Sequence, residues 1–231
     1  MVRERRALLT VMTALAVGGL SVAACSGDDD PAGPPAGGGN DPTAVAVASG
    51  DSQTGKTLEL LNDPLVVRVT DAQGASVSGA VVSWSITQGS GTLSAASSTS
   101  DAQGQASITF TPGTTIETSR VEARVTGVAT AASFTVETSV LVIEMEGTAF
   151  IAPDGTDEVT IPLGATVEWV NRDAIRHTAT SNSMPVGGPM IDSGSMAQGD
   201  RFSFTPNMAG VWTYFCEFHP VAMAGATITV Q

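Results

Sequence analysis

Short runs of strand-forming residues, each bounded by turn residues, recur along the chain from about residue 43 onward. Apolar and polar residues alternate within many of these runs, as expected for strands that bury one face. The chain is rich in Gly, Ser, Thr, Ala and Val and poor in Lys and aromatic residues, which favours β-modules over helical bundles. We therefore expect an all-β protein, and 231 residues are enough for two small domains.

Residues 43–138 are predicted to form the first domain. The strand-like run Leu65–Thr70 ends at the turn sequence Asp-Ala-Gln-Gly, which returns at residues 101–104. Because the flanking residues do not repeat, we interpret these as two similar turns and not as two structural repeats. Trp84 falls on the apolar face of a later strand and is a candidate core residue.

The segments Val67–Trp84 and Thr99–Gly113 resemble the bacterial Ig-like domains of invasin/intimin-type surface proteins. The resemblance implies an Ig-like β-sandwich, a type of domain that usually serves as a spacer or an adhesive stalk. Residues 43–138 contain no His and no Cys, and their carboxylates are scattered among turn positions. We therefore expect no catalytic site in this domain.

Residues 1–24 are predicted to be a lipoprotein signal peptide. A basic start precedes an apolar run from Ala7 to Val22, which is too short and wrongly flanked for a membrane span. The sequence Val-Ala-Ala-Cys ending at Cys25 resembles a bacterial lipobox, in which the leader is cut before the cysteine and the cysteine carries lipid. An ordinary signal peptide cut after Ala24 is the alternative.

Residues 25–42 would then comprise the lipidated Cys25 and a flexible linker. An Asp run is followed by a Pro- and Gly-rich stretch that cannot pack against a core. Such a linker would hold the folded part away from a membrane to which the acyl chains anchor it. We expect an exported protein that is lipid-anchored to the bacterial cell envelope, on its periplasmic or outer surface.

Residues 139–231 are predicted to form the second domain. Its expected strands cover residues 140–145, 158–162, 166–171, 201–205, 211–216 and 226–230. Trp212, Tyr214 and Cys216 would share one face, which directs the thiol into the end of the barrel and away from water. About seven or eight short strands in roughly ninety residues suit a Greek-key sandwich.

Cys216, His219 and Met223 place a thiol, an imidazole and a thioether close together in the sequence, and the only other histidine is His177. Sulfur ligands favour Cu(I), imidazole serves both Cu(I) and Cu(II), and a His2Cys site with a weak axial Met is typical of blue-copper centres. If Cys25 carries lipid, Cys216 has no disulfide partner, and metal ligation would explain an unpaired thiol in an oxidising compartment.

Taken singly, each of these side chains has a plainer interpretation: a surface or core histidine, a small buried hydrophobe, or core filler. Together they predict copper ligation by His177, Cys216 and His219, with Met223 as the axial ligand. Met184 and Met190 are alternative axial candidates, because they lie in the Gly/Pro-rich stretch after the first histidine.

Residues from about Val140 to Gln231 resemble a small cupredoxin of the plastocyanin/amicyanin group. The matching pieces are residues 160–173, His177-Thr178, residues 192–194 and the cysteine loop 214–225. In that family the first ligand histidine follows an Asn-x-Asp/Glu stretch, and the other three ligands share one loop near the C-terminus. Here one residue more separates His219 from Met223 than in many close relatives that have His-Pro in this loop. The resemblance implies a Greek-key cupredoxin β-sandwich that binds one type 1 copper ion.

The resemblance also implies roles for neighbouring residues. Thr178 sits where the family places a hydrogen-bonding residue near the cysteine loop, and Asn171 is a second candidate for supporting the site. In relatives the later loop histidine exposes a ring edge through an apolar patch, which Phe218 and residues 220–222 could supply around His219. Electrons would pass through His219 to a docked partner.

The expected function is single-electron transfer between redox partners, and not catalysis. A multicopper oxidase or a copper nitrite reductase needs more histidines than this chain has, and a dinuclear purple copper site needs a second cysteine in the loop. The formal net charge of −13 argues against nucleic acid and suits a basic redox protein such as a c-type cytochrome. Two other functions stay open: a copper carrier or storage protein, and a surface adhesion protein in which the cupredoxin fold is only structural.

Overall fold

A computed structural model describes residues 40–231. The expected signal peptide, the lipidation at Cys25 and nearly all of the linker lie outside the described residues and stay predictions. Strands β1 to β17 make up the regular structure, and no helix occurs between residues 40 and 231, so the predicted all-β class is confirmed. Accordingly, that range offers no apolar helix that could cross a membrane.

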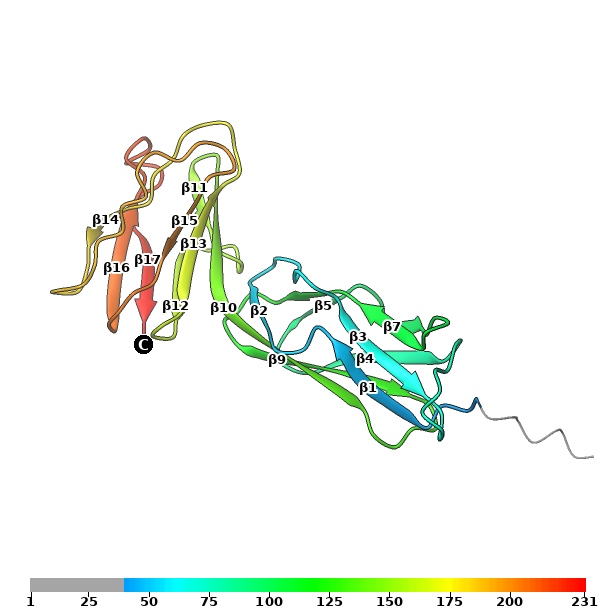
Figure 1. The fold of residues 1–231 in the computed structure, drawn as a ribbon. Coiled ribbons are helices and arrows are strands. Elements are labelled where there is room, and N and C mark those ends of the chain that lie inside the picture. Colours follow the sequence, from blue (N-terminus) through cyan, green and yellow to red (C-terminus); the bar gives the residue numbers. More distant parts are fainter. Residues whose placement is uncertain (1–39) are drawn as a thin grey trace, which may run out of the picture. The chain divides into compact units, whose positions relative to one another are not determined.

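The first sandwich contains the strands up to β9 and the first half of β10 (Ala132–Glu146) (Figure 1). Its strands are β1 (Ala44–Ser49), β2 (Gln53–Lys56), β3 (Leu65–Thr70), β4 (Val81–Gln88), β5 (Gly91–Leu93), β6 (Ser97–Thr99), β7 (Gln105–Ile108), β8 (Phe110–Pro112) and β9 (Thr118–Val125). One sheet has the order β1-β3-β7, and β10-β9-β4-β6 belong to the second. The expected core residue Trp84 is buried and packs against Phe134, with ring centroids 5.8 Å apart.

The second sandwich contains the rest of β10 and the strands that follow. Its strands are β10 (Ala132–Glu146), β11 (Ala149–Ile151), β12 (Glu158–Ile161), β13 (Thr166–Asn171), β14 (Thr180–Ser183), β15 (Arg201–Phe204), β16 (Gly210–Phe215) and β17 (Ala226–Val230). One layer is β15-β13-β10 with β11, and the other is β12-β17-β16-β14. Trp169, Trp212 and Tyr214 fill the space between the two layers and are fully buried.

Strand β10 belongs to both sandwiches. Residues 132–137 pair antiparallel with β9, and residues 140–145 pair parallel with β13. The strand predicted over residues 140–145 therefore continues a strand of the first sandwich, and the run from 132 to 146 contains neither Gly nor Pro to interrupt it. The predicted domain boundary between residues 138 and 139 therefore falls inside a continuous strand.

The buried residues change from even to odd positions along β10. Phe134 and Val136 point into the first core, whereas Leu141, Ile143 and Met145 point into the second. The switch from even to odd positions coincides with a register shift between Thr138 and Val140 in the pairing of β10 with β2, as expected where a bulge adds one residue to a strand.

Candidate metal centre

Cys216 follows directly after β16, at the end of the second sandwich. Trp212, Tyr214 and Cys216 are all 0% exposed, as the alternation along this strand predicts. Tyr214 packs edge-on against Trp169 and Phe150, with ring centroids 5.2 and 4.7 Å apart. The thiol therefore sits at the edge of a dense aromatic core, out of contact with bulk water.

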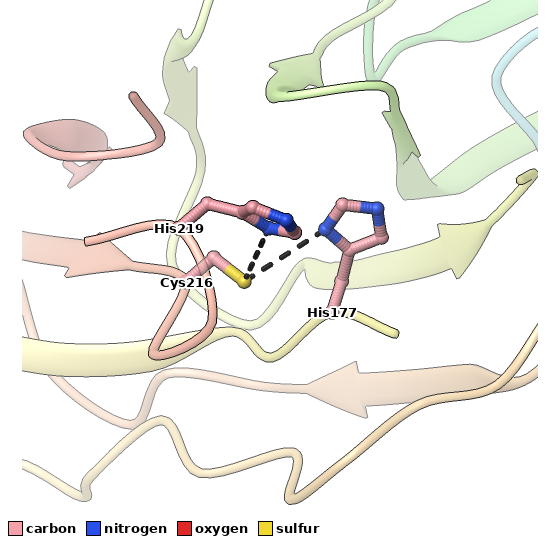
Figure 2. A group of neighbouring side chains, drawn as sticks. All are labelled: His177, Cys216 and His219. Atoms are coloured by element: carbon pink, nitrogen blue, oxygen red, sulfur yellow. Dashed lines mark hydrogen bonds between the residues drawn. The ribbon is translucent and has the colours of Figure 1, made fainter. Parts of the chain in front are cut away.

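Three of the predicted ligands meet at this point (Figure 2). The sulfur of Cys216 lies 3.7 Å from Nδ1 of His177 and 3.5 Å from Nδ1 of His219. All three donor atoms lie within 4.8 Å of one another. His177 is fully buried, and His219 is only partly buried.

The spacing of these donors fits a single metal ion. Metal bonds of about 2.3 Å to thiolate sulfur and about 2.0 Å to imidazole nitrogen would separate sulfur and nitrogen in a trigonal plane by about 3.7 Å. The observed sulfur–nitrogen separations of 3.7 and 3.5 Å are close to that value. One thiol and two imidazoles are a donor set that suits copper.

Backbone hydrogen bonds close the loop that carries Cys216, His219 and Met223. The amide of His219 donates to the carbonyl of Cys216 at 3.1 Å, and the amide of Met223 donates to the carbonyl of His219 at 2.9 Å. The amide of Cys216 in turn donates to the carbonyl of Met223 at 3.0 Å. The loop geometry thus holds all three residues together.

The methionines differ in how far they are withdrawn from water. Met223 is 2% exposed and belongs to the same apolar cluster as Cys216. Met184 is partly buried against that cluster, and Met190 is 62% exposed. Of the three axial candidates, Met223 alone is both buried and tied by its backbone to Cys216.

Thr178 supports the cysteine from two directions. Its amide donates a hydrogen bond to the sulfur of Cys216 at 3.3 Å, and this contact is buried. Its Oγ1 accepts a hydrogen bond from the amide of Glu217 at 2.9 Å. An N–H group directed at sulfur stabilises negative charge on it, so this contact favours the thiolate.

Asn171 acts on the loop that carries His177. Its fully buried side chain donates to the carbonyls of Ile175 and Met196 at 2.7 and 3.0 Å, and its Oδ1 accepts from the amide of Asp173 at 3.0 Å. Met196 also exchanges two backbone hydrogen bonds with His177. Asn171 therefore fixes the path of the chain before the histidine and does not touch the sulfur.

Asp173 is a functional candidate that the sequence analysis did not single out. Both of its carboxylate oxygens lie 3.2 Å from Nε2 of His177, on the side of the ring away from Cys216. Burial opposes ionisation, but hydrogen bonds from His177 and from the amides of Gly147 and Ile175 hold the pKa of this carboxyl below its ordinary value. In the sequence, the only indication of this role is a carboxylate four residues before the ligand histidine.

Such a carboxylate commonly orients a metal-binding histidine. A hydrogen bond at one ring nitrogen fixes the tautomer and leaves the other nitrogen free to ligate. With Nε2 engaged by Asp173, Nδ1 of His177 is the nitrogen directed at the sulfur of Cys216.

Comparison with known proteins gives one result for each sandwich. Residues 62–138 match the family of bacterial Ig-like domains (group 1). Over 65 residues the chain is 37% identical to an amicyanin of Paracoccus versutus and 31% identical to an amicyanin of Paracoccus denitrificans. These matches cover 28% of this chain, and the chain spans about half the length of these curated relatives.

Solved structures of amicyanin are also similar. The crystal structure of the Paracoccus versutus protein is 32% identical, with 40% of this chain and 81% of that chain covered at a TM-score of 0.34. A reduced mutant amicyanin is 27% identical, with 40% and 82% covered at a TM-score of 0.34. From the two sequence matches, the chain combines a bacterial Ig-like domain with a C-terminal amicyanin-like cupredoxin region.

Proposed function

We propose that this protein is a type 1 copper protein that carries single electrons between redox partners in the cell envelope. The observation that carries the proposal is the convergence of one buried thiol and two imidazole Nδ1 atoms within 4.8 Å. The presence of Met223 in the same closed loop supports a fourth, weak ligand.

A bound copper ion would supply the one-electron couple between Cu(II) and Cu(I). The residues around it hold the donors in one arrangement, because each ligand loop is tied by backbone hydrogen bonds and by Asn171 or Thr178. Donors held in this way change position little between the two oxidation states, which favours rapid electron transfer.

His219 is the ligand best placed to face a partner, because His177 is fully buried and His219 is not. Phe218 is 51% exposed and Val221 is 92% exposed on either side of it in the sequence. These two side chains offer a partner exposed apolar surface next to His219 in the sequence. We infer that a redox partner docks over this loop and exchanges electrons through the His219 ring edge.

The proposed partner is a basic redox protein such as a c-type cytochrome, since the chain has a formal net charge of −13. We further propose that the protein is exported and anchored in the envelope by lipid on Cys25. The lipobox-like sequence and the linker that follows it support this placement.

The test uses residues 37–231, which form one compact unit. Cu(II) is added to this protein and to Cys216→Ser, and visible absorption and EPR spectra are recorded. We expect an intense thiolate charge-transfer band and a narrow copper hyperfine splitting, both lost in the variant. Colourless, weakly bound copper in the unmodified protein would overturn the proposal.

A second measurement separates electron transfer from copper storage. The copper-loaded protein is mixed with a basic c-type cytochrome, and the rate of its reduction or oxidation is followed at increasing salt. A rate that falls as salt rises fits an electron carrier with a basic partner. Rapid loss of copper to a chelator without any electron exchange would favour a carrier or storage protein instead.

A further inference from the structure

The outer face of β13 is buried, although the alternation along this strand should expose it. Val167 and Trp169 point into the core between the two layers, and Glu168 and Val170 point to the other side. Glu168 and Val170 are nevertheless only 6% and 1% exposed. Another part of the chain must therefore cover this face of the second sandwich.

A short segment from the first sandwich contacts Glu168 on this face. We call residues 53–61, comprising β2 and the turn after it, the bracing segment. Its residue Leu61 lies in the first core and donates its amide to the carbonyl of Phe110 at 3.1 Å. Its residue Lys56 reaches Glu168 of β13, and Nζ lies 2.9 Å from both carboxylate oxygens.

The ion pair extends into a network of four charged groups. Arg201 of β15 also donates to Glu168, and its second amino group donates to Oε1 of Glu59 in the bracing segment at 2.7 Å. Two of the four charged residues thus come from the bracing segment, and two come from the second sandwich. Each sandwich supplies one cation and one anion, and two of the ion pairs, Lys56–Glu168 and Arg201–Glu59, join one sandwich to the other.

Because Glu168 is buried, its negative charge depends on the residues that pair with it. The side chain of Glu168 is 8% exposed, and a buried charge is tolerated only when it is paired and hydrogen-bonded. Burial alone would raise the pKa of Glu168, but hydrogen bonds from Lys56 and Arg201 outweigh it and hold the pKa below its ordinary value. Ser203 donates a further bond to the carboxylate at 3.3 Å.

Backbone contacts fix the bracing segment on the shared strand. Strand β2 pairs parallel with residues 136–140 of β10, and the amide of Thr57 donates to the carbonyl of Val140 at 2.9 Å. The hydroxyl of Thr57 accepts the amide of Val142 at 2.9 Å, and Thr57 is fully buried. Leu58 then takes a left-handed conformation with φ of 57°, which a leucine adopts only where its surroundings hold it.

A second contact lies elsewhere in the first sandwich. Ile116, in the connection before β9, packs against the hydrophobic core of the second sandwich. The cupredoxin region therefore gains part of its packing from the Ig-like part of the chain.

We propose that the Ig-like sandwich is a rigid mount for the cupredoxin sandwich, with the bracing segment completing its outer sheet, and not a freely jointed spacer. The two sandwiches would then unfold as one cooperative unit, and the electron-transfer end would be held at a fixed orientation. This inference does not depend on copper, so it can fail while the proposed function stands, and the reverse also holds.

The test uses metal-free residues 37–231 and compares Lys56→Met with Arg124→Met. Arg124 also pairs with a carboxylate, that of Glu122, but within the first sandwich and with 59% of its side chain exposed. Calorimetry should show a single unfolding transition for the unmodified protein. Lys56→Met should lower the midpoint by about 5 °C, because it removes one of the two cations that pair with the buried carboxylate of Glu168 and leaves only Arg201. Arg124→Met should change the midpoint little.

Hydrogen exchange locates the effect. In Lys56→Met, amides of β13 and β15 in the second sandwich should exchange faster although the changed residue is in the first. The double variant with Lys56→Met and Glu168→Met should recover most of the lost stability, since an apolar pair can replace a buried ion pair. Two separate transitions in the unmodified protein, or exchange in β13 and β15 unaltered by Lys56→Met, would overturn the proposal.

Discussion

The buried polar side chains of the two sandwiches have different partners. In the first, buried Asp71 and Ser100 form hydrogen bonds with nearby backbone groups. Asp71 accepts hydrogen bonds from the amides of Gln73 and Ala75. The hydroxyl of Ser100 donates to the carbonyl of Val77 and accepts from the amide of Ala80. In the second, Asn171, His177, Thr178 and Cys216 gather at one end of the barrel. There the thiol and two imidazoles face one another, and the sulfur also accepts the amide of Thr178.

This difference shows how one architecture can serve both as support and as a binding site. A buried polar group that bonds nearby backbone serves to hold a turn or a strand and is not directed at a ligand. At the end of the second sandwich, backbone is kept in place by Asn171 and Thr178, so that Nδ1 of both histidines and the sulfur stay available. The capacity to bind a metal therefore comes from this arrangement of supporting and ligating residues, and not from the β-sandwich itself.

The largest expected effect comes from Cys216→Ser. A hydroxyl cannot replace a thiolate as a strong copper ligand, so the charge-transfer band should disappear and copper affinity should collapse. Visible spectroscopy and a copper titration measure this, and circular dichroism checks that the fold is retained. A variant that kept the intense band would show that the metal binds elsewhere.

Asp173→Asn should have an intermediate effect. The amide can still contact His177, but it no longer supplies the charge that orients and polarises the ring, so copper affinity should fall about 10–100-fold. The matched control is Asp154→Asn, because Asp154 accepts a turn amide from Thr156 at 3.0 Å and does not touch a proposed ligand. Equal copper affinities in these two variants would show that Asp173 does not support copper binding.

Ser100→Ala should affect stability without affecting copper binding. This change deletes a buried hydroxyl that bonds Val77 at 2.7 Å and accepts the amide of Ala80 at 2.9 Å, so the free energy of unfolding should fall by about 1–3 kcal/mol. The copper spectrum should stay unchanged. A shifted spectrum would mean that the two regions are not divided in function as we describe.

The smallest expected effect concerns acid stability. The folded-state pKa of Glu168 lies below the value of 4.5 that it would have when unfolded, so its contribution is present above about pH 4.5 and is lost as the pH falls through the folded-state value. The groups facing it are Lys56 from β2 and Arg201 and Ser203 from β15. Urea unfolding at pH 7 and at pH 3.5 should show a smaller acid loss for Glu168→Gln than for the unmodified protein.

Much of this arrangement could be predicted from local pattern. The strand alternation around Trp212 and Tyr214 correctly placed Cys216 on the buried face. The positions of His177 and His219 were also informative, because they are the only histidines in the chain. Local sequence pattern is enough to predict the position of a side chain when its own strand or loop determines where it points.

Other features depend on contacts between distant parts of the chain, and pattern alone does not reveal them. Glu168 looks like an ordinary exposed residue of a strand with one buried face, and Lys56 like an ordinary surface lysine. Only the fold brings these two residues together and buries Glu168. The continuity of β10 was missed for a similar reason, since strand ends are set by pairing partners as well as by sequence.

Strand β10, which both sandwiches share, also limits how the gene for such a protein could change in length. Most domain junctions accept insertions, because a linker can grow without disturbing either side. Here one codon inserted between Val136 and Leu141 would turn Leu141, Ile143 and Met145 to the side now taken by Val142. Two codons would restore the side but shift the register by about 6.6 Å. The junction should therefore tolerate substitutions much better than insertions or deletions.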